Sequence, residues 1–155
     1  MKPLKLIFIS NTGNTRNFAE NLVNYAQEQN QKNPDYPLLS IEEISEQTDF
    51  ENENEPYFVS VPTYLSGGDG TGDNVKEVMT NILGEYLDYH DNAKQCLGII
   101  GSGNKNFNIQ YCLTAKRYSK RFNVPFLADF ELRGNDKDVQ RIYEDMVERT
   151  KEVNQ

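Results

Sequence analysis

Apolar residues along the chain form two kinds of pattern: short runs bounded by turn residues, and repeats with the period of a helix. A continuous apolar run that ends in turn residues is typical of a buried strand. The predicted strands are residues 4–9, 38–44, 57–62, 96–100 and 126–132. The last of these contains a polar position, so we expect it to be interrupted near Ala128 and Asp129.

Helical repeats occupy the stretches between most of these strands. Apolar positions three and four residues apart predict amphipathic helices. The predicted helices are residues 15–29, 75–86, 111–122 and 139–150, the last opened by Asn135 or Asp136. The evidence for a helix between the second and third strands is weaker. This alternation predicts an α/β fold in one domain, residues 1–155, with a doubly wound five-stranded parallel sheet in the order 2-1-3-4-5 and helices on both faces.

A polar hexapeptide, residues 10–15, stands between the first strand and the first helix. Backbone N–H groups and the positive end of a helix dipole face an anion at such a junction. Hydroxyls at Ser10, Thr12 and Thr15 add donors, and Gly13 allows a tight turn. The loop contains no Lys or Arg, which favours a bound monophosphate over a reacting triphosphate. An ordinary strand–helix turn rich in capping residues would explain the same pattern.

Two further loops are rich in Gly, Ser, Thr and Asn, and they follow the third and fourth strands at residues 63–72 and 101–108. In the predicted strand order these two loops and the hexapeptide meet at one edge of the sheet, where ligands of such folds bind. Tyr111 shares a helical stripe with Ala115, so it could instead be a core residue. The candidate binding residues are Ser10, Asn11, Thr12, Gly13, Asn14, Thr15, Pro62, Thr63, Tyr64, Leu65, Ser66, Gly67, Gly68, Ser102, Gly103, Asn104, Asn106, Phe107, Asn108 and Tyr111.

Composition narrows the classes of function. A net charge of −8 argues against a nucleic-acid surface, and no apolar run is long enough to span a membrane. Two cysteines and one histidine are too few for a disulfide framework or a His-based metal site, so we expect no metal and a cytoplasmic protein. Half of the fourteen residues from Glu42 to Glu55 are acidic, which is typical of a solvated loop or a mobile insertion.

Several motifs resemble a known family. Ser10-x-Thr12-Gly13-x-Thr15 matches the phosphate-loop pattern of flavodoxins, and residues 101–104 with Tyr111-Cys112 are similar to the flavodoxin third loop. Other segments resemble, more specifically, the NrdI family of flavodoxin-like flavoproteins that serve class Ib ribonucleotide reductase. These segments are residues 55–57, 61–64, 102–107, 124–126 and 130–134. The resemblance covers nearly the whole chain, although the acidic stretch departs from it.

The resemblance implies a redox role. Members of this family bind FMN, are reduced by a partner protein, and react with O₂ to give superoxide or peroxide. They deliver this species to the dimanganese site of the small subunit of the reductase, where metal oxidation leads to a tyrosyl radical. The flavin carries that chemistry, and the protein supplies orientation, electrostatics and access. By this resemblance the protein is an activating factor of the reductase rather than a stand-alone enzyme.

Two alternatives stay open: a generic flavodoxin electron carrier, and a flavodoxin-like binding module without flavin. Electron carriers commonly place Trp and acidic side chains beside the flavin, whereas this chain has no Trp and has Asn104-Lys105 in the third loop. One charge at ~6 Å and an effective dielectric of ~20 is worth roughly 3 kcal/mol. The exchange of an acid for an amide and a cation therefore favours full reduction. The glycines of residues 66–72 could rearrange beside the flavin and leave space for O₂.

Overall fold

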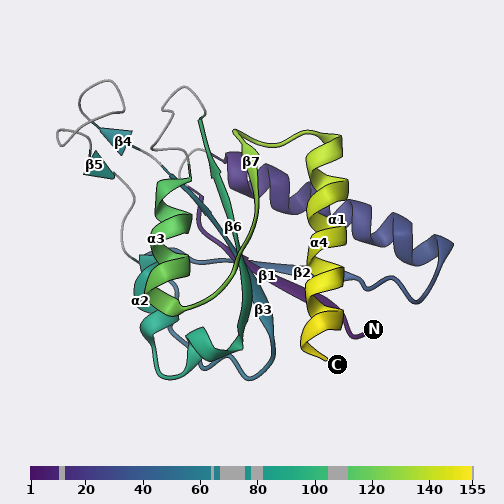
Figure 1. Ribbon diagram of the computed structural model, residues 1–155, viewed down its shortest axis with the longest axis horizontal. Coiled ribbons are helices and arrows are strands. Elements are labelled where there is room, and N and C mark those ends of the chain that lie inside the picture. Colours follow the sequence, from purple (N-terminus) through teal and green to yellow (C-terminus); the bar gives the residue numbers. More distant parts are fainter. Residues whose placement is uncertain (11–12, 64, 67–75, 78–81, 105–111, 155) are drawn as a thin grey trace.

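Five parallel strands form the central sheet in the order β2-β1-β3-β6-β7, which confirms the predicted 2-1-3-4-5 order (Figure 1). The computed structural model describes residues 1–10, 13–63, 65–66, 76–77, 82–104 and 112–154. The strands are β1 Leu4–Phe8, β2 Leu39–Glu43, β3 Tyr57–Pro62, β6 Cys96–Gly103 and β7 Phe126–Glu131.

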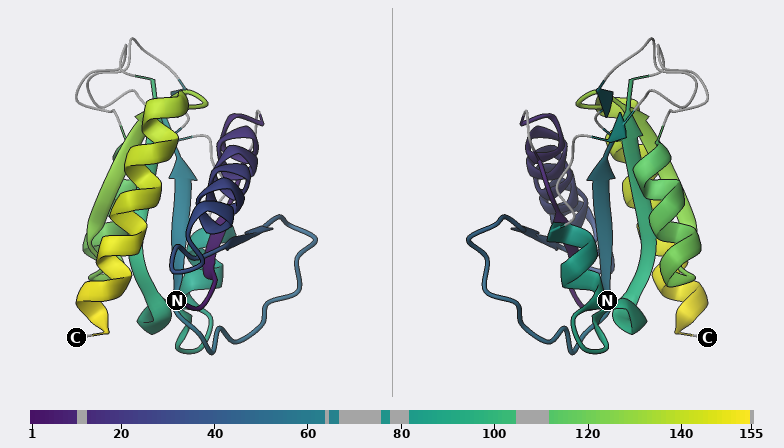
Figure 2. Two further views of the ribbon diagram at one scale, coloured as in Figure 1. Left: turned by 90° about the vertical axis from the view of Figure 1, so that its right-hand side faces the viewer. Right: turned by 90° about the vertical axis from the view of Figure 1, so that its left-hand side faces the viewer.

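Helices cover both faces of this sheet, as the doubly wound prediction requires (Figures 1 and 2). Helices α1 (Asn14–Lys32) and α4 (Asp136–Val153) pack on one face, and α2 (Ile82–Asp88) and α3 (Leu113–Phe122) on the other. A 3₁₀ turn, η1 (Asn92–Gln95), precedes β6. Neighbouring residues of β1 face opposite ways, so Leu6 packs in the α1–α4 core and Ile7 in the α2–α3 core.

Four details differ from the sequence prediction. Strand β6 continues to Gly103, because Ser102 and Gly103 pair with β7. Strand β7 is not broken at Asp129, although its pairing with β6 shifts register between Phe126 and Ala128. Residues 44–56 contain no helix. The predicted helix over residues 75–86 is confirmed only from Ile82, and Lys76–Glu77 (β5) pairs instead with Leu65–Ser66 (β4) in a small antiparallel sheet. Interstrand pairing there overrides a helical period in the sequence.

The acidic stretch is anchored to the fold at Glu53 rather than solvated along its whole length. The Glu53 side chain is 7% exposed and lies between two partners. The Lys5 ammonium donates to its Oε1 at 2.6 Å, and the Tyr86 hydroxyl donates to its Oε2 at 3.0 Å. The backbone N–H of Glu53 donates to Asn92 Oδ1 at 2.7 Å. This network ties the β2–β3 connection to β1, α2 and η1.

We expect Glu53→Gln to lower the free energy of unfolding by about 1–2 kcal/mol, because the amide weakens a buried charge-assisted hydrogen bond. Glu55→Gln is the matched control, since Glu55 lies two residues away and is exposed. It should change stability by less than about 0.5 kcal/mol. Urea unfolding followed by circular dichroism measures both. Equal effects of the two substitutions would mean that Glu53 is solvated, as the composition alone suggests.

Candidate functional site

The carboxyl ends of the strands bring together the segments that the sequence predicted to meet. The backbone N–H of Thr63, after β3, donates to the Ser102 carbonyl of β6 at 2.9 Å. The backbone N–H of Leu132, after β7, donates to the Gly103 carbonyl at 2.9 Å. Because all five strands are parallel, the start of α1 lies at this edge as well (Figure 1). The edge is therefore one continuous rim built from the ends of four strands.

The start of α1 is capped by a glycine. Gly13 is its N-cap residue, with φ +89° in the left-handed region, which an L side chain rarely adopts. The Gly13 N–H donates to Ser10 Oγ at 3.1 Å, so this amide is already engaged within the loop. Ser10 accepts that bond, and its own hydroxyl proton remains a donor for another group. Asn14 begins the helix.

Thr15, in the first turn of α1, has a hydroxyl without a visible partner. Its side chain is fully buried, and among the described residues Oγ1 makes no hydrogen bond. A buried hydroxyl without a partner costs roughly 1–3 kcal/mol, so this group is available to hydrogen-bond a ligand or a water molecule. Ser60 has the same property but lies inside the sheet, in register with Phe8 and Ile100. Of these two described residues, Thr15 is the one at the positive end of a helix.

Arg16, the cation that follows this loop in the sequence, is paired with a carboxylate. Arg16 forms a two-point ion pair with Glu43 at the end of β2, from Nε to Oε1 at 2.7 Å and from Nη2 to Oε2 at 2.8 Å. An anion at Gly13 would therefore meet hydroxyls, amides and a helix dipole beside a balanced pair of charges. Recognition of an anion by neutral groups at this loop stays a prediction, and Arg16 Nη1 would lie 3.9 Å from a Cβ on Gly13.

Several predicted site residues are buried or hydrogen-bonded within the rim. Thr63 Oγ1 accepts a hydrogen bond from the backbone N–H of Thr114 at 2.9 Å, which fixes the first turn of α3. Ser102 lies within β6 and is 2% exposed, and Pro62 is buried in β3. Gly103 and Asn104 are half-buried at the end of the described third-loop segment.

Gly101 was not among the predicted site residues, and the structure gives it a role. A Cβ on Gly101 would lie 2.8 Å from Ala115 Cβ and 3.1 Å from Cys112 Cβ, so α3 packs directly on the backbone of β6. This close contact sets where the third loop leaves the sheet. The sequence signal was available, because Gly101 opens the Gly-Ser-Gly-Asn motif at the end of an apolar run.

The cysteines play no part in the candidate chemistry. Both are buried, and burial raises the pKa of the Cys96 thiol to about 12, so it is not a thiolate at neutral pH. Within the described ranges, no group of His, Cys, Asp and Glu side chains is arranged to hold a metal ion. None of the helices described is long and apolar enough to cross a membrane.

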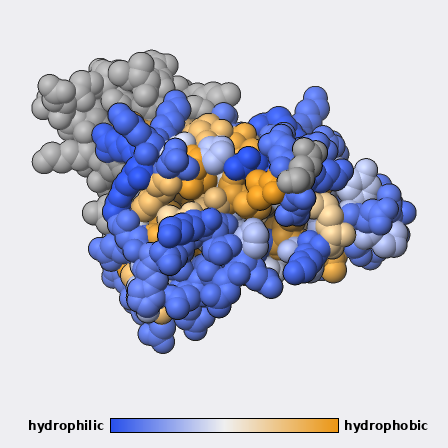
Figure 3. All heavy atoms as spheres, turned by 60° about the horizontal axis from the view of Figure 1, so that its bottom comes forward, coloured by the Kyte–Doolittle hydropathy of each residue, from blue (hydrophilic) through white to orange (hydrophobic). Residues whose placement is uncertain are grey.

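An apolar hollow of about 360 Å³ lies at the opposite edge, where the strands begin (Figure 3). Met1, Pro3, Pro56, Leu97 and Val153 contribute to its lining. Both chain termini lie at this side of the fold (Figure 1). The hollow shares no residue with the polar loops, so we do not assign it to the candidate site.

Other predicted site residues lie outside the described part of the chain. Leu65 and Ser66 are described only as strand β4. The sequence also predicted that the glycines of residues 66–72 can rearrange. Residues 67–72 lie outside the described part of the chain, so this hypothesis stays a prediction. The predicted residues outside the description are Asn11, Thr12, Tyr64, Gly67, Gly68, Asn106, Phe107, Asn108 and Tyr111.

Comparison with known proteins identifies the family. A family model described as NrdI flavodoxin-like matches residues 6–144, which include every strand of the central sheet at least in part. The chain belongs to the NrdI family. A putative NrdI-like protein of Streptococcus pyogenes serotype M18 is 48% identical over 150 residues, covering 96% of this chain and 95% of the relative. Protein NrdI of Mesoplasma florum is 34% identical over 138 residues, covering 88% and 79%.

Solved structures show the same architecture in flavodoxins. A short-chain flavodoxin associated with a non-canonical PDU bacterial microcompartment superposes with a TM-score of 0.62 at 19% identity, covering 97% of this chain and 98% of that one. At this identity the likeness concerns the fold. It agrees with the flavodoxin-like topology of this NrdI-family chain.

Proposed function

We propose that this NrdI-family protein binds FMN at the carboxyl edge and, once reduced, supplies superoxide or peroxide to the dimanganese small subunit of class Ib ribonucleotide reductase. Membership of the NrdI family supports the partner, and the flavodoxin-like fold supports a flavin. The partners in this proposal are the radical-bearing small subunit, a reductant protein and O₂ as co-substrate.

The observation that best supports FMN as the cofactor is the Thr15 hydroxyl at the start of α1, which has no partner among the described residues. A monophosphate bound there would accept a hydrogen bond from Thr15 Oγ1 and another from the Ser10 hydroxyl, beside the positive end of the helix dipole. The left-handed Gly13 leaves no side chain on the turn that the phosphate would approach. These groups fit the phosphate of FMN, and riboflavin would leave them unused.

The flavin, when bound, supplies the electrons that reduce O₂. The protein's own residues hold the binding rim in one shape. The Thr63–Ser102 and Leu132–Gly103 backbone bonds join the strand ends, and the Thr63–Thr114 bond fixes α3 against them. The Cys96 thiol does not compete for electrons as a thiolate, because burial raises its pKa to about 12.

Reconstitution with a manganese-loaded small subunit, the reduced protein and O₂ tests this function. We expect a tyrosyl radical, measured by electron paramagnetic resonance, in an amount that depends on the concentration of the protein. Chemically reduced free FMN with O₂ is the control, and it should give far less radical, because the oxygen species then diffuses into solution. A yellow protein that yields no radical would favour a generic electron carrier. A purified protein that neither carries nor takes up flavin would favour a flavin-free binding module.

A further inference from the structure

Helix α3 concentrates positive charge on an otherwise acidic protein. It contains four of the sixteen Lys and Arg residues of the chain in ten positions and has no Asp or Glu, while the whole chain carries a net charge of −8. The four cations occupy positions i, i+1, i+4 and i+5, which form one helical face. They are Lys116, Arg117, Lys120 and Arg121, and we call them the α3 cation stripe.

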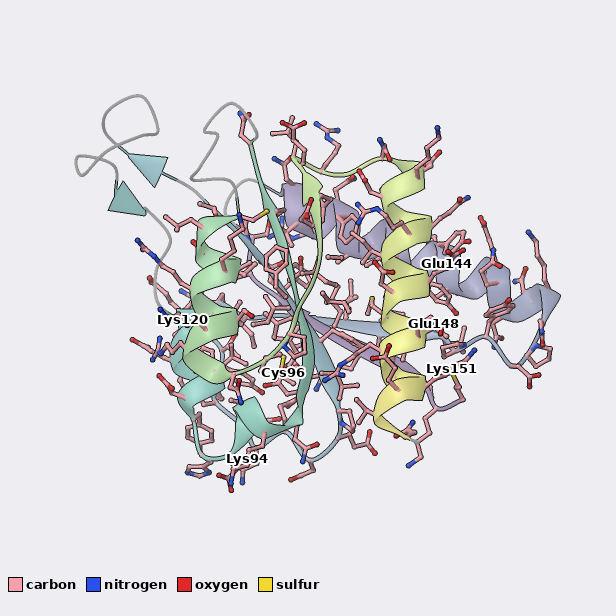
Figure 4. The ribbon with its side chains drawn as sticks, in the orientation of Figure 1. Lys94, Cys96, Lys120, Glu144, Glu148 and Lys151 are labelled. Atoms are coloured by element: carbon pink, nitrogen blue, oxygen red, sulfur yellow. The ribbon has the colours of Figure 1, made fainter. Side chains whose placement is uncertain are left out.

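The stripe is turned to solvent. All four residues are exposed, whereas Thr114, Ala115 and Tyr118 pack inward on the same helix. Arg121 is partly compensated, because it pairs with Asp88 of α2 and lies 4.8 Å from the centre of the Phe122 ring. Figure 4 shows Lys120 on the outer side of α3, far from Lys151 on α4 across the molecule.

The stripe begins beside the candidate flavin site. The first turn of α3 is fixed to the rim through the Thr114–Thr63 hydrogen bond, and Lys116 is two residues beyond Thr114. A partner that covers α3 would therefore also face the carboxyl edge. The position suits a protein that must bring its own redox centre close to the flavin.

We propose that the α3 cation stripe is the docking surface for an acidic electron-donor protein, the reductant of the flavin. This inference rests on the proposed function. An exposed charged stripe speeds encounter and sets orientation, which suits a brief electron-transfer contact with a small interface. Nucleic acid is a poorer fit, because the chain carries a net charge of −8 and a polyanion needs wider neutralisation. A donor protein with a small acidic patch needs only the α3 cation stripe as its complement.

The test uses Lys116→Glu/Lys120→Glu in the full chain. The matched control is Lys32→Glu/Lys151→Glu, which changes the net charge equally at exposed positions of α1 and α4. Glu is a good helix former, so both variants should fold. The acidic probe is a reduced plant-type ferredoxin, and the basic probe is oxidised cytochrome c as an electron acceptor. Stopped-flow absorbance measures electron transfer to and from the FMN-loaded proteins.

With ferredoxin at low ionic strength, we expect the α3 variant to react at least about tenfold more slowly than the wild type. The control variant should slow by less than about threefold. The difference should vanish near 1 M salt, where the Debye length is ~3 Å. The rate with cytochrome c should not fall in the α3 variant. Equal slowing of both variants with ferredoxin would show a net-charge effect and overturn the proposal.

A second measurement does not require flavin. A carbodiimide joins a ferredoxin carboxylate to a lysine amine as an amide, with the loss of water, and mass spectrometry locates the bond. We expect cross-links at Lys116 and Lys120 in the wild-type protein. Cross-links that fall on Lys94 or Lys151 and spare α3 would overturn the docking surface. If the protein takes up no FMN, the proposed function fails, and the cross-linking result still decides the docking surface separately.

Discussion

Replacing Thr15 by valine should weaken FMN binding by about ten- to a hundredfold without destabilising the flavin-free protein. The Thr15 hydroxyl is buried and has no partner among the described residues, so removing it breaks no internal hydrogen bond that the structure shows. Valine keeps the shape of the side chain. A hydrogen bond to a charged phosphate is worth roughly 1.5–3 kcal/mol, which gives the expected range of affinity loss.

Two comparisons make this prediction specific to the phosphate. Riboflavin lacks the phosphate, so its affinity should be equal for wild type and Thr15→Val in a fluorescence titration. Ser60→Ala removes the other unpartnered buried hydroxyl, which lies inside the sheet, and it should leave FMN affinity unchanged. Urea unfolding of the flavin-free proteins should show no loss of stability for either variant. If Thr15→Val weakens riboflavin as much as FMN, Thr15 is not a phosphate ligand.

Replacing Gly101 by alanine should lower the free energy of unfolding by about 2–3 kcal/mol and weaken flavin binding with it. The added methyl group would lie 2.8 Å from Ala115 Cβ, with Cys112 Cβ and Sγ at 3.1 and 3.2 Å. These are backbone-proximal atoms of a packed helix, so α3 must shift away from β6. Overpacking of a filled core costs about 1–3 kcal/mol, and here the shift also moves the third loop.

The double variant Gly101→Ala/Ala115→Gly tests the cause of that loss. Ala115→Gly alone should cost about 1 kcal/mol through helix propensity. If the clash is responsible, the double variant should be more stable than the sum of the single effects predicts, by at least about 1 kcal/mol. Gly98→Ala is the control on the same strand. Its new Cβ would lie 3.2 Å from the Leu127 Cβ, a less severe contact, so it should cost less. Additive effects of Gly101→Ala and Ala115→Gly would rule out the packing explanation.

The acidic stretch contains a buried carboxylate network that composition alone does not predict. Glu53 joins three elements through Lys5, Tyr86 and Asn92, on the side of the sheet that also carries α2. Burial and the hydrogen bond to Glu53 raise the pKa of the Tyr86 hydroxyl well above its usual value, so it remains a donor throughout the physiological range. Hydrogen bonds to Glu53 and Glu42 raise the pKa of Lys5 against the opposing effect of desolvation, so its contribution to stability is lost only above its ordinary pKa.

The sequence determined the strand order, the two-faced sheet and the strand ends that share the carboxyl edge. Each of these depends on local periodicity and on the rule that parallel strands end together, as the runs at Leu4–Phe8 and Tyr57–Pro62 illustrate. Residues 10–15 could be proposed as an anion loop because hydroxyls and Gly13 are adjacent in the chain, and this stays a prediction. The start of α4 was equally local, since Asn135 and Asp138 cap each other.

Only the tertiary structure decided the features that join distant residues. Glu53 is buried because Lys5, 48 positions away, and Tyr86, 33 positions away, together satisfy its carboxylate. Strand β6 extends to Gly103 because β7 offers pairing partners there. The Thr15 hydroxyl could be listed from the sequence as a donor, but its burial without a partner depends on how the chain packs around the start of α1. Local periodicity contains no information about such partners, because their energies arise when segments far apart in the chain come into contact.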